Sequence, residues 1–342
     1  MVKEFLEKVI SREHLSEQEA EVVMGELMQG NLTNTQIGAF LVALRMKGET
    51  PGEISGFARA IRSRARSVQI SPLPGPVVDT CGTGGDGKHT FNISTAAAFV
   101  AAGTGLVVAK HGNRSISSRT GSADLLEALG LKIDLPVEAT VACLREVGIA
   151  FFFAPLFHQA MRYALGPRRE LGIRTVFNLL GPLTNPAGAD IQLVGVYHAD
   201  LTELVGDALR RLGCRSALVV HGCDGLDEIS ITGPTKITEV KPEGLSTYYL
   251  HPEELGLPLG RLDELIGGSP EENAKIFYEV LQGVPGSRRN VVLLNSAAVL
   301  LAAERAPDWE TALALAEESI DRGAAFAKFE ALKAFTGREI PC

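Results

Sequence analysis

The stretch from Asp79 to Thr95 reads DTCGTGGDGKHTFNIST and gathers glycine, hydroxyl and amide groups in one short segment. Two valines, Val77 and Val78, come directly before it and predict a short strand. The alanine-rich run from Ser94 to Ala102 comes at its end and predicts a helix. A strand, a glycine loop and a helix N-terminus form an anion site, because backbone N–H groups and the helix dipole face the ligand.

Three interpretations of this loop compete: binding of a nucleoside triphosphate, binding of another phosphate, and a plain tight turn. A Walker A loop needs Ser or Thr directly after its lysine, but His89 follows Lys88 here. The glycines 82, 84 and 87 have dinucleotide-type spacing, but no helix is predicted to open there. A turn needs neither four glycines nor the polar side chains that follow them. The loop therefore favours another phosphate ligand, such as a diphosphate.

A second polar loop follows the next predicted strand, Leu106–Ala109. It begins at Lys110, includes His111 and Arg114 among several serines, and precedes a helix that opens at Gly121. α/β proteins bind ligands at the carboxyl ends of their strands, although a solvated surface loop would look similar. Two adjacent strand ends with anion donors suggest a ligand with more than one phosphate.

An acidic segment follows a third predicted strand, Ala217–Val220. It contains Asp224, Asp227 and Glu228. Mg²⁺ prefers hard carboxylate oxygens and substrate phosphates, so these acids could hold Mg²⁺ against a diphosphate. A turn with solvated acids is the alternative interpretation.

Composition and charge narrow the class of protein. The chain has 342 residues, of which 45% are hydrophobic, and a net charge of −8, which disfavours a broad nucleic-acid-binding face. Its five cysteines form no C-x-x-C pair, which argues against a zinc site. We find no apolar leader and no stretch long enough to span a bilayer. These features favour a soluble, cytoplasmic protein.

The pattern along the chain predicts two parts. Helix caps of capping-box form begin at Ser16, Thr33 and Thr50, so the N-terminal residues favour a small helical domain over 1–70. We expect a contribution to it from about 158–186, a loop-rich basic segment. Short apolar runs then alternate with helical patterns, which is typical of an α/β domain with a mostly parallel sheet. We assign this domain to 75–342.

Taken together, these motifs closely resemble the anthranilate phosphoribosyltransferase family. The resemblance covers nearly the whole chain in the expected order and is carried by GTGGD (Gly82–Asp86), FNIST (Phe91–Thr95), KHGNRSISS (Lys110–Ser118), GSADLLEALG (Gly121–Gly130), RRELGIRTVFNLLGPLTNP (Arg168–Pro186) and HGCDGLDE (His221–Glu228). It implies a nucleoside-phosphorylase type of fold. The reaction it implies joins the amine of anthranilate to C1 of phosphoribosyl diphosphate (PRPP) and releases diphosphate, a step of tryptophan biosynthesis.

The resemblance also implies site residues. Those that would line the PRPP site are Gly82, Gly85, Asp86, Thr90, Asn92, Ile93, Ser94, Thr95, Lys110, His111, Gly112, Asn113, Arg114, Ser115, Ile116, Ser117, Ser118 and Ser122. Gly82, Asn113 and Arg168 would contact anthranilate. Ser94, Asp227 and Glu228 would hold Mg²⁺, with two ions per subunit when PRPP is bound. We expect Lys110, Asn113 and Arg168 to act in catalysis, and do not assign His111 as a base.

The resemblance further implies a homodimer formed through the helical domain. An association with anthranilate synthase is a further partner that the resemblance suggests. Neither a nucleic acid nor a membrane is an expected partner. Two alternative functions remain to be weighed: a pyrimidine nucleoside phosphorylase of the same fold, and a non-enzymatic nucleic-acid-binding relative. Arg168 and the pair Asp227 and Glu228 suit a carboxylate and a metal diphosphate, which disfavours the phosphorylase.

Overall fold

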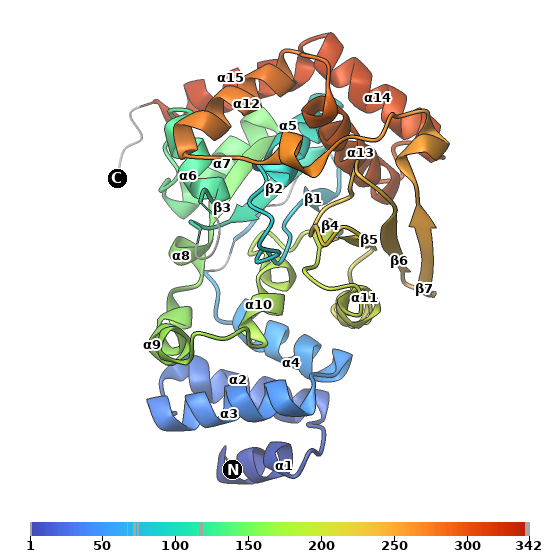
Figure 1. Ribbon diagram of the computed structural model, residues 1–342. Helices are drawn as coiled ribbons and strands as arrows, with labels where there is room; N and C mark the ends of the chain where they lie inside the picture. The colour runs from blue at the N-terminus through green and yellow to red at the C-terminus, as the bar shows by residue number, and fades with distance from the viewer. Residues whose placement is uncertain (1, 67, 71–72, 74, 116–118, 339–342) are drawn as a thin grey trace.

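The computed structural model describes residues 2–66, 68–70, 73, 75–115 and 119–338. N-terminal helices form one end of the molecule, a seven-stranded sheet lies in the middle, and C-terminal helices cover the other end (Figure 1). This arrangement confirms the predicted fold class. Among the described helices, none combines the length and the apolar character that crossing a bilayer requires.

Four helices make up the N-terminal end, which we call the helical unit: α1 (Val2–Ile10), α2 (Glu17–Gln29), α3 (Asn34–Lys47) and α4 (Pro51–Arg62). The three predicted capping boxes begin α2, α3 and α4. In each box the N-cap hydroxyl of Ser16, Thr33 or Thr50 accepts a hydrogen bond from the third helical N–H. Each box satisfies two N–H groups that the helix itself leaves unpaired.

Residues 154–184 return to this helical unit. They form α8 (Ala154–Phe157), η1 (Gln159–Met161), α9 (Arg162–Leu171), α10 (Phe177–Leu180) and η2 (Pro182–Thr184). Helix α9 packs on α2 and α3, and α10 packs on α4. Ala164, Phe177 and Leu180 are buried in the same apolar cluster as the N-terminal helices.

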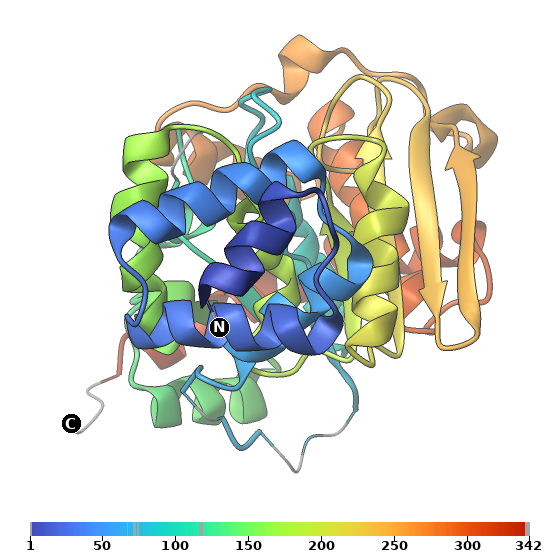
Figure 2. The same ribbon diagram turned by 90° about the horizontal axis from the view of Figure 1, so that it is seen from below.

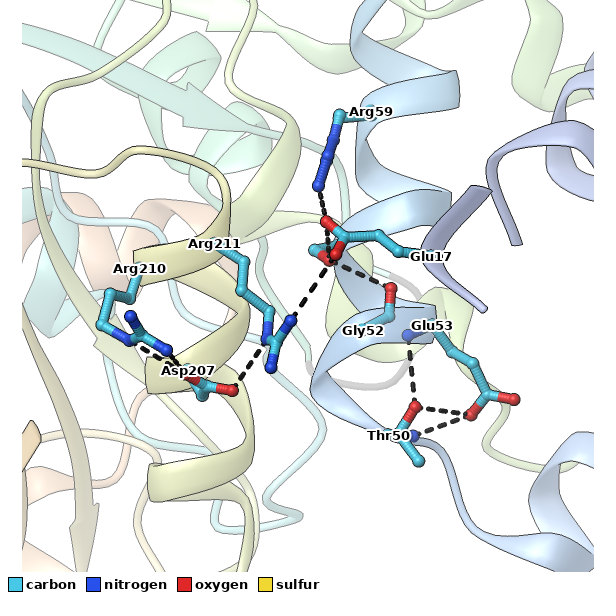
Figure 3. Close-up of polar contacts among 9 residues, drawn as sticks. Glu17, Thr50, Gly52, Glu53, Arg59, Asp207, Arg210 and Arg211 are labelled. Atoms are coloured by element: carbon cyan, nitrogen blue, oxygen red, sulfur yellow. Dashed lines mark hydrogen bonds and ion pairs between the residues drawn. The ribbon is translucent and has the colours of Figure 1, made fainter. Parts of the chain in front are cut away.

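An ion-pair network also crosses from the helical unit to α11 (Leu201–Arg211), as Figure 3 shows. Glu17 pairs with Arg59 of α4 and lies 3.5 Å from Nη1 of Arg211. Asp207 of α11 in turn accepts hydrogen bonds from Arg210 at 2.7 Å and from Arg211 at 2.9 Å. Partly exposed pairs of this kind contribute only about 0–1 kcal/mol each, so buried apolar contacts between α4 and α11 hold the junction.

The sheet has the strand order β3-β2-β1-β4-β5-β6-β7. Its strands are β1 (Val77–Asp79), β2 (Val107–Gly112), β3 (Ile149–Phe153), β4 (Ile191–Gly195), β5 (Ser216–Gly222), β6 (Thr235–Lys241) and β7 (Gly244–Leu250). The first five are parallel, and β1, β2 and β5 correspond to the three apolar runs predicted above. The antiparallel hairpin β6–β7 was not predicted. Neither of its strands is a continuous apolar run: β6 interleaves polar residues with buried ones, and only Leu250 of β7 is buried. Figure 2 shows the hairpin at one edge of the molecule, beyond α11.

Helix α5 (Ile93–Gly103) lies in the centre of the α/β part, with nine buried residues. The other helices of this part are α6 (Ser122–Ala128), α7 (Val137–Val147), α12 (Pro270–Leu281), α13 (Ser287–Ala302), α14 (Trp309–Asp321) and α15 (Ala324–Thr336). The alanines of α5 let α13 and α15 approach closely, and the rings of Phe99, Phe277 and Phe329 lie edge to face 5.3–5.9 Å apart. This packing fixes the N-terminus of α5 at the ends of the strands.

Candidate active site

The glycine loop after β1 has a backbone that glycine makes possible. Gly84, Gly85 and Gly87 have φ angles of 65°, 79° and 73°, in the left-handed region that L side chains rarely adopt. The N–H of Thr83 donates to the carbonyl of Gly195 at 2.8 Å. The loop therefore rests on the end of β4, and α5 begins directly beyond it.

The strands before the glycine loop and the basic loop, β1 and β2, are neighbours as expected, whereas β4 lies between β1 and β5. Gly195 at the end of β4 allows the acidic loop to cross this gap. A Cβ atom at Gly195 would lie 1.6 Å from the carbonyl oxygen of Asp227. A Cβ at Gly82 would lie 3.3 Å from Oδ2 of Asp227. The absence of a side chain at both glycines brings the acidic loop against the glycine loop.

Three carboxylates meet at this crossing: Asp86 from the glycine loop, and Asp227 and Glu228 from the loop after β5. The N–H of Asp227 lies 3.5 Å from Oδ2 of Asp86, and the N–H of Ser94 donates to Oε1 of Glu228 at 3.2 Å. Burial raises the pKa of both Asp227 and Glu228, and the Asp86 carboxylate raises the pKa of Asp227 further. Such a group of hard oxygens with unbalanced negative charge fits Mg²⁺. Asp86, predicted to line the PRPP site, thus lies with the predicted metal ligands.

A buried carboxylate, Asp79, organises the ends of β1 and β2. Its Oδ1 accepts hydrogen bonds from the N–H groups of Thr80 at 2.8 Å and His111 at 3.1 Å, and its Oδ2 accepts one from Asn185 at 2.7 Å. Lys110 is also buried, and its Nζ donates to the Thr80 carbonyl at 2.8 Å. Burial raises the pKa of Asp79 to about 6, and the Lys110 charge lowers it in part. Asp79 was not predicted as a site residue, although a charged residue at the end of a buried strand is a usable signal.

The imidazole of His111 lies in the interior beside that of His158, with ring centroids 5.3 Å apart. Within the described part of the chain, strict hydrogen-bond geometry gives neither ring a partner. Burial, and to a smaller extent the neighbouring His158 ring, lower the pKa of His111 to about 3, although the Gly181 carbonyl opposes this shift in part. His111 is therefore neutral near physiological pH, which agrees with the decision not to assign it as a catalytic base.

Ion pairs and hydrogen bonds to carboxylates of α6 hold the loop after β2. Nη1 of Arg114 lies 3.1 Å from Asp124 and its Nη2 lies 2.8 Å from Glu127, while the N–H of Ser115 donates to Asp124 at 3.0 Å. Asn113 is exposed. The predicted residues Ile116, Ser117 and Ser118 lie outside the described residues. Gly112 packs against Ser122 and Phe151, whose atoms would lie 2.3 and 2.6 Å from an added Cβ.

The FNIST segment offers mostly backbone to a ligand. The side chains of Ile93 and Thr95 are buried, and the side chain of Asn92 donates to the Thr120 carbonyl at 3.1 Å and accepts from Asn273 at 3.0 Å. Thr90 and Ser94 are only half-buried. Their hydroxyl groups are therefore the side-chain groups of this segment that a ligand can best reach.

Two arginines come from the segment that packs on the helical unit. Arg168 on α9 is half-buried, lies 5.0 Å above the ring of Phe177, and has its pKa lowered by burial. Arg174 was not predicted to act at the site. It stacks on Tyr197 at 4.4 Å and donates to the carbonyl of Gly85 in the glycine loop. These contacts connect the helical side of the molecule to the predicted phosphate loop.

Comparison with known proteins agrees with this geometry. Residues 3–65 match the helical bundle domain of a glycosyl transferase family, and residues 74–326 match the a/b domain of the same family. The chain is 60% identical to the anthranilate phosphoribosyltransferase of Moorella thermoacetica over 98% of both chains. It is 54% identical to that of Syntrophobacter fumaroxidans, over 98% of this chain and 99% of the relative.

Solved structures give the same result. The crystal structure of anthranilate phosphoribosyltransferase from Thermus thermophilus superposes with a TM-score of 0.92 at 45% identity, covering 98% of this chain and 99% of the other. The Saccharomyces cerevisiae enzyme in complex with PRPP and Mg superposes with a TM-score of 0.88 at 30% identity, covering 98% and 97%. Together, the glycine loop, the acidic cluster and these likenesses place the chain in the anthranilate phosphoribosyltransferase family.

Proposed function

We propose that this chain transfers the phosphoribosyl group of PRPP to the amine of anthranilate at the crossing of the glycine and acidic loops. The bond from C1 of the ribose to the diphosphate oxygen breaks, a bond from C1 to the anthranilate nitrogen forms, and the amine loses a proton. The meeting of Asp86, Asp227 and Glu228 with the glycine loop is the observation that carries this proposal. The named relatives favour this function over the pyrimidine nucleoside phosphorylase and the nucleic-acid-binding relative.

Asp227, Glu228 and Ser94 hold Mg²⁺ in this proposal, with two ions per subunit when PRPP is bound. Mg²⁺ neutralises charge that builds up on the departing diphosphate. The yeast enzyme crystallised in complex with PRPP and Mg, which supports the use of this cation. The raised pKa values of Asp227 and Glu228 support it as well, because carboxyls that repel each other gain most from a shared cation.

The chain's own groups bind and orient the PRPP. The backbone N–H groups of Gly82 and Gly85 and the dipole of α5 face the diphosphate, whereas the Thr83 N–H bonds the Gly195 carbonyl. The loop from Lys110 to Ser118, with Ser122, holds the remaining phosphate and ribose oxygens. The ammonium of Lys110 donates to the Thr80 carbonyl and is thereby held in place. Lys110 therefore contributes a fixed positive charge near the leaving group and does not contact it directly.

Arg168, Asn113 and Gly82 bind anthranilate. A guanidinium can bond a planar carboxylate at two points, and Arg168 is already partly desolvated against Phe177. Arg168 comes from the helical side, and Asn113 follows β2. Residues 1–70 with about 158–186 therefore form one domain that closes on the other, 75–342, and keeps water away from C1.

An assay with anthranilate, PRPP and Mg²⁺ that follows the loss of anthranilate fluorescence tests the function. Arg168→Ala should raise KM for anthranilate with little change in the Mg²⁺ requirement. Asp227→Ala combined with Glu228→Ala should change the Mg²⁺ requirement instead. The opposite pattern would exchange the two subsites, and phosphorolysis of uridine or thymidine without anthranilate transfer would refute the proposal.

We also propose a homodimer formed through the helical unit. Ile10 and Met46 are large apolar side chains of this unit that are 62% and 71% exposed, and Val22 is 41% exposed. Exposed apolar side chains mark an interface where they form one contiguous patch, and in this proposal these three do so. Sedimentation equilibrium of Met46→Lys beside the wild-type chain tests this, since a monomeric wild type would contradict it. A cytoplasmic location and an association with anthranilate synthase stay predictions.

A further inference from the structure

A group of three metal-ligating side chains lies at the start of the glycine loop, and none of the three is assigned a proton transfer or a bond to Mg²⁺ in the proposed reaction. Asp79 and Cys81 come from the end of β1, and His111 comes from the end of β2. Their ligand atoms, one from each residue, all lie within 4.8 Å of one another. In a tetrahedral site with bonds of about 2.0–2.3 Å, ligand atoms lie about 3.3–3.8 Å apart. A movement of about 1 Å would therefore complete the geometry.

A second observation points to a ligand at this place. His111 is 3% exposed, and neither of its ring nitrogens meets a partner within strict hydrogen-bond geometry among the described residues. The Gly181 carbonyl, which raises the His111 pKa in part, can serve at most one of the two nitrogens. Buried polar nitrogens are normally paired, because an unpaired one has lost its water without replacement. One of these two nitrogens is the ligand atom that lies close to Asp79 and Cys81. A metal ion would supply the missing partner.

Asp79 can accept a metal ion without giving up its present bonds. Its Oδ1 accepts two hydrogen bonds, and its Oδ2 accepts one from Asn185. An ionised carboxylate has about four lone-pair positions, so Oδ2 keeps one free. Asp79 can thus bind a metal while it continues to hold the ends of β1 and β2 together.

The donor set selects the class of cation. Thiolate, imidazole and carboxylate together suit Zn²⁺ and its neighbours in the transition series, whereas Mg²⁺ avoids sulfur and nitrogen. The Cys81 thiol must lose its proton, which burial opposes. The positive charge of Lys110 also repels a cation at this place. The negative charges of Asp227 and Glu228 attract a cation, just as they raise the pKa of the Cys81 thiol. A bound Zn²⁺ would balance the thiolate and the Asp79 carboxylate.

We propose that Asp79, Cys81 and His111 form a site for Zn²⁺ or a similar thiol-binding divalent cation, and that its occupation inhibits the enzyme. The inhibitory part rests on the proposed function, because Gly82 is assigned to anthranilate and His111 to PRPP. A metal ion that draws Cys81 and His111 together would displace His111 and also Gly82, which follows Cys81 in the chain. The sequence argued against a zinc site, because it has no C-x-x-C pair; the ligands come instead from two neighbouring strand ends.

Cobalt titration tests the site without any activity measurement. Co²⁺ replaces Zn²⁺ in such sites and gives a thiolate-to-metal charge-transfer band in the near ultraviolet. With the full chain in saturating Mg²⁺, which occupies the hard-oxygen site, we expect one equivalent of Co²⁺ to produce this band and Zn²⁺ to remove it. Cys81→Val should abolish the band and weaken Zn²⁺ binding by at least about 100-fold. The matched control Cys223→Ser, which changes an exposed free thiol, should leave both unchanged.

The outcomes separate the two parts of the proposal. No band in the wild-type chain, a band that survives in Cys81→Val, or a band lost in Cys223→Ser would overturn the site. Circular dichroism of Cys81→Val, with Cys81→Ser as a second variant of similar size, shows that the loss of the band does not come from unfolding. A Cys81-dependent band with Zn²⁺-insensitive turnover would overturn the inhibitory role. A wild-type chain with no transferase activity in Mg²⁺ buffer free of Zn²⁺ would refute the proposed function and leave the cobalt result valid.

Discussion

Replacing Asp79 with asparagine measures what it costs to keep one carboxylate in the interior of this fold. Asp79 is 0% exposed, and burial raises its pKa from 3.8 to about 6. Between these two pH values the folded chain binds the proton more tightly than the unfolded chain does. The free energy of unfolding therefore falls as pH rises through this range. At about 1.4 kcal/mol for each pH unit, the whole fall is about 3 kcal/mol.

The Asp79→Asn variant cannot ionise, so its stability lacks this fall. In the wild-type chain the side-chain nitrogen of Asn185 donates to Asp79 at 2.7 Å. The asparagine at position 79 would turn an amide N–H₂ group toward that nitrogen. Two donors facing each other cost about 1–3 kcal/mol for each buried group left unpaired, at every pH. The variant should therefore be less stable than the wild type at pH 4.5. The difference should shrink by about 2 kcal/mol by pH 7.5, because the wild-type chain loses that stability over this interval.

Urea unfolding followed by circular dichroism at both pH values measures the two free energies. Asp134→Asn, which makes the same chemical change at an exposed position, is the matched control. A difference between wild type and Asp79→Asn that stays within about 0.5 kcal/mol across the two pH values would refute the reasoning. A difference between wild type and Asp134→Asn that shrinks with pH in the same way would also refute it, because that difference could not arise from burial of Asp79.

Three further predictions concern the site itself. Gly195→Ala would place a Cβ 1.6 Å from the Asp227 carbonyl oxygen, so the acidic loop must move and kcat/KM should fall at least about 100-fold; steady-state kinetics on the folded variant check this. Protons compete with Mg²⁺ for Asp227 and Glu228, whose pKa values are raised, so the half-saturating Mg²⁺ concentration should fall between pH 6 and pH 8; a flat profile would contradict this. Arg174→Ala removes a charged donor to Gly85 and should raise KM for PRPP about tenfold, for about 1.5 kcal/mol of lost bonding. Arg174→Lys, which cannot stack on Tyr197 in the same way, should behave like Arg174→Ala, and a loss confined to kcat would contradict the assignment.

Much of the fold could be predicted from the sequence, because its strongest signals are local. The capping boxes at Ser16, Thr33 and Thr50 depend on side chains three residues apart, and all three formed as expected. Each of the five parallel strands contains a short apolar run, as strands buried on both faces tend to. The hairpin Thr235–Leu250 escaped prediction because neither strand carries a continuous apolar run, and β7 buries only Leu250.

The site was predictable as a set of loops and not as a set of contacts. Glycine spacing and acidic residues mark the loops after β1 and β5, and these loops do converge. That Asp86 joins Asp227, or that Arg174 reaches Gly85, depends on which strands are neighbours and on where α9 packs. A single sequence contains no signal for such pairs. The same reason hides the nearness of Cys81 to His111, since their strands are neighbours in space but far apart in the chain.

The acidic cluster couples the position of the glycine loop to that of the loop after β5. Asp86 belongs to the glycine loop, whereas Asp227 and Glu228 follow β5, so repulsion between these carboxylates acts across the boundary of two loops. A cation shared between them removes that repulsion and draws the loops together, which also releases the protons that the raised pKa values retain. Arg174 then transmits any shift of the glycine loop to the helical side, because it bonds the Gly85 carbonyl and stacks on Tyr197. Binding of the charged substrate and closure of the helical domain are therefore expected to be one coupled event, in which Asp86 and Arg174 act on the same loop from its two sides.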